Sequence, residues 1–223
     1  MSSDRSVIAD SLGVGLATGV YGVSFGAIAT ASGLSVVQAS VMSLLIFTGA
    51  SQFAFVGVIA AGGAPLAGAA TAVLLGSRNL FYGVSLAPHL KLRGAAKAAA
   101  AHVVIDESTA MAVTRETSHH ARLGFHWTGW SIFILWNLST FIGALAGNAI
   151  GDPRTYGLDA AVGAAFLGLL WPRLDSMAMR LIALIAAAAA LGLIPFTAAG
   201  MPIILGGGFA IALGMAWPKK STT

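Results

Sequence analysis

Long apolar runs separated by short polar clusters dominate this sequence. No charged residue occurs from Ser11 to Ser77, a stretch of 67 residues, and a second charge-free stretch of 38 residues runs from Leu181 to Pro218. One helical crossing of a bilayer needs about 20 apolar residues. The first stretch therefore accommodates about three crossings and the second about two short ones, so the pattern predicts helices that span a membrane.

Dividing the apolar runs at polar clusters, proline and glycine pairs predicts eight spans. They are Leu12–Ala31, Val36–Ala61, Pro65–Pro88, Ala98–Thr114, Trp127–Ile150, Leu158–Trp171, Leu181–Ile194 and Met201–Trp217. The last three are short for a full crossing, so they are expected to be longer than drawn, buried or re-entrant, and the count is seven or eight. Arg115–His126 is predicted to be the most polar connector. The prediction is an all-α, polytopic transmembrane helical bundle, with some helices short or broken, that forms one integral membrane domain over residues 1–223.

Composition agrees with this pattern and excludes several classes of protein. Hydrophobic residues make up 57% of the chain and charged residues 9%, against about 25% charged residues in soluble domains. The net charge of +4 comes from basic residues between the apolar runs, as membrane topology produces, so we expect no nucleic-acid partner. The chain has no cysteine and no nucleotide-binding, HExxH or GxSxG motif, so we expect neither an enzyme nor a cofactor. The polar start at Ser2–Arg5 predicts a retained first helix rather than a cleaved signal peptide.

With eight spans, both termini lie on one side of the membrane. That side would carry Arg5, Arg115, Arg122, Arg173, Arg180, Lys219 and Lys220. The other side would carry Lys91, Arg93, Lys97 and Arg154. This excess of basic residues favours cytoplasmic termini.

Small residues recur along the first span at helical spacing. Gly15/Gly19 and Gly22/Gly26 are small-xxx-small pairs, which let helices pack backbone to backbone in lipid. Tight packing is the favoured interpretation, and a helix that bends beside a ligand is the alternative. Two short motifs resemble each other weakly, as expected if one half of the chain duplicated the other: Gly33-Leu34-Ser35 and Gly157-Leu158-Asp159.

Polar groups inside apolar runs are expensive in a bilayer, so each is a candidate functional residue. Thr48, Ser51 and Gln52 offer hydrogen bonds in the middle of the second run. They either bond neighbouring helices or line a site for a polar ligand. Arg78 and Asn79 lie deep in the third run, where a permanent positive charge needs an acid, carbonyl groups or an anionic ligand.

The fourth run holds the adjacent acids Asp106 and Glu107, with His102 one turn earlier. Adjacent helical residues point about 100° apart, so one acid is expected to pair with Arg78 and the other to take an ammonium group or a proton. His102 and Asp106 are four residues apart, so on one helix they would share a face and could form a proton relay. The alternative is that this helix lies at the interface and its charges are hydrated.

Two further polar groups are candidates. Asn137, within Trp136-Asn137-Leu138-Ser139-Thr140, is either a second polar island for a ligand or an interhelical hydrogen-bonding group. His119, His120 and His126 could bind a metal, but a solvated loop is favoured, so no metal site is assigned.

Several stretches of this sequence resemble the AzlC family, the large subunits of branched-chain amino-acid exporters. They are Gly22-Val23-Ser24-Phe25-Gly26, Met42-Ser43, Phe47-Thr48-Gly49-Ala50-Ser51-Gln52-Phe53, Arg78, Leu80-Phe81-Tyr82-Gly83, Ser85-Leu86, Asp106-Glu107 and Gly157-Leu158-Asp159. The resemblance covers about residues 12 to 175. It implies a multi-pass protein of the bacterial plasma membrane that exports small apolar amino acids, coupled to protons, together with a small AzlD-like membrane subunit.

The sequence and the resemblance together give a set of candidate residues for a transporter. The expected substrate-binding residues are Thr48, Ser51, Gln52, Arg78, Asn79, Tyr82 and Asn137, and the expected coupling residues are His102, Asp106 and Glu107. Phe25, Phe47 and Phe53 are expected to supply an apolar pocket. The alternatives are a non-transporting assembly or sensor subunit and a channel for small polar solutes.

Overall fold

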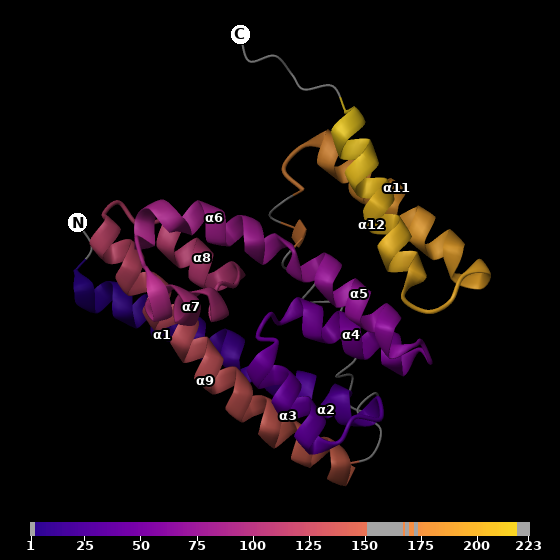
Figure 1. The fold of residues 1–223 in the computed structure, drawn as a ribbon, viewed down its shortest axis with the longest axis horizontal. Helices are drawn as coiled ribbons and strands as arrows, with labels where there is room; N and C mark the ends of the chain where they lie inside the picture. The colour runs from indigo at the N-terminus through magenta and orange to yellow at the C-terminus, as the bar shows by residue number, and fades with distance from the viewer. Residues whose placement is uncertain (1–2, 151–166, 168–169, 172–173, 218–223) are drawn as a thin grey trace.

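The computed structural model describes residues 3–150, 167, 170, 171 and 174–217, and every regular element among them is a helix (Figure 1). The elements are α1 (Asp4–Val20), α2 (Gly22–Ala31), α3 (Val36–Leu45), α4 (Ala50–Ala60), α5 (Pro65–Gly76), α6 (Arg78–Leu90), α7 (Gly94–His102), α8 (Asp106–Val113), α9 (Ser118–Ile150), α11 (Met177–Leu193), the 3₁₀ turn η3 (Ile194–Phe196) and α12 (Met201–Ala216). The predicted all-α class is confirmed.

In the part of the chain that the structure describes, three stretches of helix are long and apolar enough to cross a membrane: Asp4–Ala31, Ser118–Gly147 and Met177–Phe196. The other apolar helices among the described residues are shorter, such as Val36–Leu45 and Ala50–Ala60. The predicted mixture of long helices with short or broken ones is therefore observed. Most of the predicted span Leu158–Trp171, and the Gly157-Leu158-Asp159 motif, lie outside the described residues.

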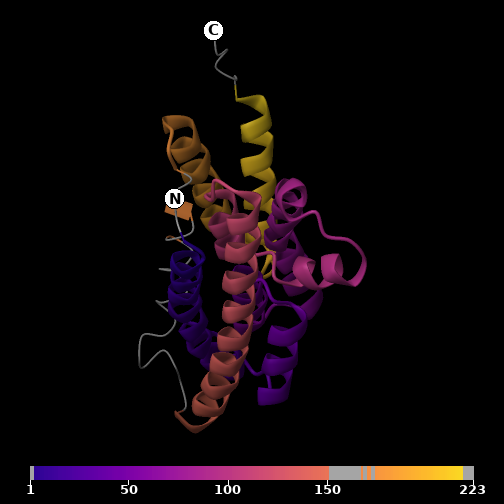
Figure 2. The same ribbon diagram turned by 90° about the vertical axis from the view of Figure 1, so that its left-hand side faces the viewer.

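The joined helices α1 and α2 pack along α9 in the same direction (Figures 1 and 2). Glycines allow this close approach, because the position where each would carry a Cβ is already occupied by α9. The pairs are Gly15 with Ser131, Gly19 with Leu135, Gly22 with Trp136 and Gly26 with Thr140. The predicted tight packing of the first span is confirmed.

Two predicted spans are interrupted near their middles, and each forms two helices, in agreement with the predicted short or broken helices. Val36–Ala61 divides at residues 46–49, where Gly49 has a φ of +58° that favours glycine. Ala98–Thr114 divides at residues 103–105, where the Ser108 hydroxyl donates to the Val103 carbonyl (2.7 Å) and accepts from the Ile105 N–H (3.1 Å). The Ser108 side chain thus satisfies backbone groups that the interruption exposes.

The second interruption separates α7 from α8. Helix α7 starts, and helix α8 finishes, at the same end of the bundle. The start of α7 follows directly from the end of α6, where the Arg122 guanidinium donates to the His89 carbonyl (3.2 Å). At the far end of α8, Arg115 lies 3.0 Å from Asp10 of α1. Because α7 has 9 residues and α8 has 8, each is only about 12–14 Å long, less than half of a hydrocarbon core.

The pair α3 and α4 has the opposite arrangement. In Figure 1 the α2–α3 and α4–α5 connections both lie on the side away from the N-terminus. One order of elements therefore occurs twice in residues 4–113: a long helix with a joint, then two half-helices with a break between them. The first copy (α1–α4) starts at the end of the bundle where the N-terminus lies, and the second copy (α5–α8) finishes at that end. The two copies therefore form an inverted repeat, an arrangement also found in transporters.

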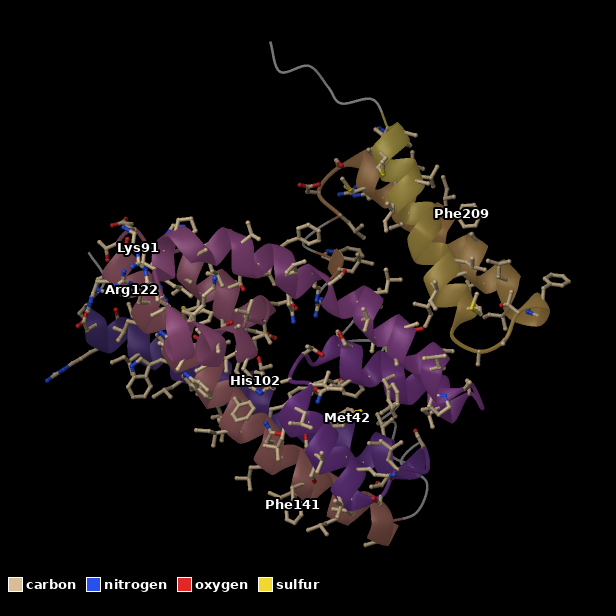
Figure 3. The ribbon with its side chains drawn as sticks, in the orientation of Figure 1. Met42, Lys91, His102, Arg122, Phe141 and Phe209 are labelled. Atoms are coloured by element: carbon tan, nitrogen blue, oxygen red, sulfur yellow. The ribbon has the colours of Figure 1, made fainter. Side chains whose placement is uncertain are left out.

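The charged loops are distributed differently from the prediction. The α6–α7 loop with Lys91 lies at the end of the bundle where α1 and α9 begin, near Arg122 (Figure 3). The predicted assignment of the Lys91 loop to the side opposite Arg122 was therefore wrong. The cause is that α7 and α8 turn back instead of crossing, which returns the chain to the end it left.

The segment Arg115–His126 is also more regular than predicted. The structure continues α9 back to Ser118, so His119, His120 and His126 lie on a helix rather than in a loop. The C-terminal hairpin of α11 and α12 packs against α5, where the Thr71 hydroxyl donates to the Gly200 carbonyl (3.5 Å).

Candidate functional site

The helix interruptions meet around one cavity of about 380 Å³. Its lining comes from the α1–α2 joint, the α3–α4 break, the start of α6, the α7–α8 break and the middle of α9. The lining residues are Ala17, Thr18, Tyr21, Phe47, Thr48, Gly49, Ala50, Phe53, Arg78, Ile105, Asp106, Glu107, Ile132 and Trp136. Both copies of the inverted repeat therefore contribute to the cavity.

An ion pair, together with a tyrosine that is hydrogen-bonded to it, forms the charged side of this cavity. Arg78 Nη2 lies 2.7 Å from Asp106 Oδ2, and the Tyr82 hydroxyl donates to Asp106 Oδ1 (2.6 Å). The Arg78 and Asp106 side chains are 28% and 14% exposed, so the pair is largely shielded from solvent. Arg78 Nε is buried and has no hydrogen-bond partner among the described residues. The predicted pairing of Arg78 with one of the two acids is observed, and the acid is Asp106.

Glu107 stands beside this pair without an ion-pair partner in the described part of the chain. It lies in the first turn of α8, next to Asp106. Arg78 is already held by Asp106, so the second carboxyl group remains available to a cation or a proton that enters the cavity.

Two half-helices present their N-termini to the cavity with different chemistry. At the start of α4, Gln52 Oε1 accepts from the Gly49 N–H (3.2 Å), and no acid occurs in the first turn. At the start of α8, Asp106 and Glu107 occupy the first turn. A helix N-terminus carries about half a positive charge. The acids offset that charge at α8, whereas at α4 it is left to attract an anion.

Aromatic side chains form the apolar wall of the cavity. Tyr21 and Phe53 have ring centroids 5.5 Å apart, and the rings of Phe53 and Trp136 are 6.2 Å apart and nearly perpendicular. Phe47 completes the lining. Phe25 lies behind this layer, fully buried against Phe53 and Trp136, so its predicted place in the pocket was wrong.

Of the predicted site residues, Thr48, Arg78, Asp106 and Glu107 line the cavity. Tyr82 is outside the lining, and its hydroxyl donates to Asp106. Buried polar atoms without a hydrogen-bond partner among the described residues include Thr48 Oγ1, Ser51 Oγ, Gln52 Nε2 and Asn79 Oδ1. Ser51, Gln52 and Asn79 are not part of the lining, although each is next in the chain to a lining residue. Asn137 donates to the Phe133 carbonyl of its own helix (2.8 Å) and is also outside the lining.

The predicted relay between His102 and Asp106 was wrong in its geometry. Since α7 ends at His102 and α8 begins at Asp106, the two residues do not share a helical face. His102 Nε2 instead lies 2.9 Å from the Leu44 carbonyl, and its ring stands edge-on to Phe133 (Figure 3).

Sequence reasoning missed Thr18, Tyr21 and Ile132 of the lining. Thr18 and Tyr21 carried a weak signal, because polar groups near the middle of an apolar run are unusual. Ile132 carried none, since an aliphatic residue on α9 looks the same whether it faces lipid or a cavity.

These features define an integral membrane protein of the polytopic helical class, in which interrupted helices enclose a partly charged cavity. The family model described as AzlC protein matches residues 13–150. The chain belongs to the AzlC family, as the resemblance in its motifs indicated. Membership and the apolar helices are consistent with a role in membrane transport.

Two curated relatives show how far the similarity extends. The chain is 33% identical over 159 residues to an uncharacterized membrane protein of Archaeoglobus fulgidus, covering 70% of this chain and 69% of the relative. It is 29% identical over 161 residues to the inner membrane protein YgaZ of Escherichia coli, covering 69% of this chain and 64% of the relative. No solved structure matches the chain.

Proposed function

We propose that this chain is the large subunit of a secondary transporter that exports branched-chain or related small apolar amino acids. The observation that carries the proposal is the composition of the cavity. Arg78, a carboxylate pair and a helix N-terminus without acids face an aromatic wall within about 380 Å³. That volume is within the range of about 300–1,000 Å³ that small-molecule sites occupy.

The carboxylate of the amino acid would be held between the N-terminus of α4 and Arg78. The first N–H groups of a helix have no partner within it and attract anions. Arg78 Nε and Thr48 Oγ1 are buried donors without a partner among the described residues. An incoming carboxylate would satisfy both groups, which otherwise cost about 1–3 kcal/mol each.

The ammonium group would be held by Glu107. A zwitterion needs a partner for each of its two charges, and the acids of α8 line the same cavity as the acid-free start of α4. Asp106 is occupied by Arg78 and Tyr82, which leaves the carboxylate of Glu107 for the cation. Phe47, Phe53 and Trp136 would then take the apolar side chain of the substrate.

Proton coupling follows from the same carboxyl group. When the substrate leaves, the ammonium no longer balances Glu107, and a proton can take its place before the cavity reopens. The inverted repeat supplies two halves that can rock around the cavity and expose it to one side at a time.

The bacterial plasma membrane is the proposed location, with a small AzlD-like membrane subunit as partner. The end that carries Arg5, Lys91, Arg115 and Arg122 would face the cytoplasm, because cytoplasmic loops are enriched in Lys and Arg. The family match and the membrane relatives support this assignment.

The test is transport of labelled valine, leucine, isoleucine and methionine in everted vesicles, which turn the cytoplasmic face outward. The chain is expressed with and without an AzlD-like subunit and assayed with and without a protonophore. We expect protonophore-sensitive uptake with both chains present. Glu107→Gln should lower it by about tenfold or more, as loss of a charged partner does, while the exposed control Glu116→Gln leaves it unchanged.

Two results would overturn the proposal in a folded complex. One is that none of the four amino acids moves. The other is that Arg78→Ala and Asp106→Asn both leave efflux unchanged. Movement at a rate insensitive to the proton gradient would indicate a channel instead.

A further inference from the structure

The N-terminal end of the bundle holds a compact cluster of three side chains that the transport proposal does not use. His119 Nε2 lies 3.1 Å from each carboxylate oxygen of Asp4, and His120 Nε2 lies 3.0 Å from Asp4 Oδ1. Their ligand atoms all lie within 4.8 Å of one another. None of the three residues lines the transport cavity.

The parallel packing of α1 and α9 creates this cluster. Asp4 is the first residue of α1, and the histidines lie in the first turn of α9, where Thr117 Oγ1 accepts from the His120 N–H (3.2 Å). Both helices therefore begin side by side (Figure 1). The glycine contacts farther along α1 fix the register that brings residue 4 opposite residues 119 and 120.

We propose that Asp4, His119 and His120 form a binding site for a divalent transition-metal cation of the zinc class. Two imidazole nitrogens and one carboxylate are a ligand set that Zn²⁺, Co²⁺ and Ni²⁺ accept. Two ligand atoms on a tetrahedral zinc ion are about 3.4 Å apart, given bond lengths of about 2.1 Å. The His–Asp separations of 3.1 and 3.0 Å are slightly shorter than this value, and the two imidazole nitrogens lie within 4.8 Å of each other, so small side-chain rotations bring all three onto one ion.

The exposure of the ligands suits an ion that enters from water. The side chains of Asp4 and His119 are 58% and 67% exposed, whereas that of His120 is only 15% exposed. His120 thus provides a fixed ligand, and the other two can adjust around the ion. Three protein ligands leave a fourth position for water.

Metal binding would tie the start of α1 to the start of α9. The span that begins with α1 and the helix α9 both contribute to the wall of the transport cavity, through Tyr21 on one side and Trp136 on the other. The site is nevertheless independent of the transport proposal, since binding can be measured without substrate and without a partner subunit.

The test is calorimetric titration of the purified chain, carrying a histidine-free tag, with Zn²⁺, Co²⁺ and Mg²⁺. We expect one equivalent of Zn²⁺ per chain, and visible absorption bands from bound Co²⁺. Mg²⁺ should bind more weakly, because it prefers oxygen ligands. Zn²⁺ should also raise the melting temperature, since it binds the folded state.

Variants separate the cluster from other metal-binding groups. His120→Ala and Asp4→Asn should each weaken Zn²⁺ binding by about tenfold or more, and His119→Ala/His120→Ala should abolish it. His126→Ala is the matched control, because it removes a histidine of the same helix outside the cluster, and it should bind as the native chain does. The inference is overturned if the native chain takes up no Zn²⁺, if the double variant binds normally, or if Mg²⁺ binds as tightly.

Discussion

Replacing Gly26 by alanine should loosen the contact between the first span and α9. A Cβ at this position would overlap the Thr140 carbonyl oxygen and lie 2.6 Å from the Ala144 nitrogen. Ordinary contacts of this kind begin at 3.4 Å. The Ala144 contact alone would require α2 and α9 to separate locally by about 0.8 Å, and the closer Thr140 oxygen requires more. The obstructing atoms are backbone, and no side-chain rotation can relieve the overlap.

The size of the expected loss of stability follows from comparison with a matched control variant, Gly13→Ala. Gly13 lies in α1, within the same span, but a Cβ there meets nothing within 4 Å. Both substitutions gain about 0.5–1 kcal/mol from the better helix propensity of alanine. Only Gly26→Ala also incurs the overpacking cost of about 1–3 kcal/mol. Gly26→Ala should therefore be less stable than Gly13→Ala by about 2 kcal/mol.

The assay is thermal unfolding of both purified variants in the same detergent, followed by tryptophan fluorescence. Trp136 is a suitable reporter because it packs at this interface against Phe25 and Gly22. We expect the melting temperature of Gly26→Ala to be roughly 4–8 °C below that of Gly13→Ala. Equal melting temperatures, or a lower value for Gly13→Ala, would refute the proposed packing of α2 on α9.

Three further predictions concern the charged side of the cavity and the break in the second run. Tyr82→Phe removes a hydrogen bond to a carboxylate and should cost about 1.5–3 kcal/mol in thermal stability; no change would mean that the hydroxyl does not bond to Asp106. Asp106→Asn leaves Arg78 without its ion-pair partner and should cost about 2 kcal/mol, less than for a fully buried pair. Adding Arg78→Gln should recover part of that loss, and a further loss would contradict the pairing. Gly49→Ala places a side chain on a backbone with φ of +58° and ψ of −89°, which favours glycine, and should cost about 1–3 kcal/mol. Gly57→Ala on α4, where a Cβ meets nothing within 4 Å, should instead gain about 0.5–1 kcal/mol in the same melting experiment.

A helical membrane protein could be predicted from the sequence alone, because a lipid environment leaves a direct signature in composition. A run of 67 residues without a charge is far longer than any helix buried in a soluble core requires. The sequence also identified Arg78, Asp106, Glu107 and Thr48 as candidates, since a polar group in an apolar run stands out whatever the fold. The family was indicated separately, by the resemblance of motifs such as the one around Gly49.

How these residues are brought together depends on helix packing, which the sequence pattern does not reveal. The break between His102 and Asp106 lies in an apolar stretch without glycine or proline, so nothing local predicted it, and Ser108 stabilises it through contacts with Val103 and Ile105. That break separates His102 from Asp106 and returns the chain to the end of the bundle where the Lys91 loop lies, so that Arg122 meets that loop. The cluster of Asp4 with His119 and His120 likewise depends on the register of two helices more than 100 residues apart. Hydrophobic patterning records which residues avoid water, but the packing of one helix on another determines which polar groups meet.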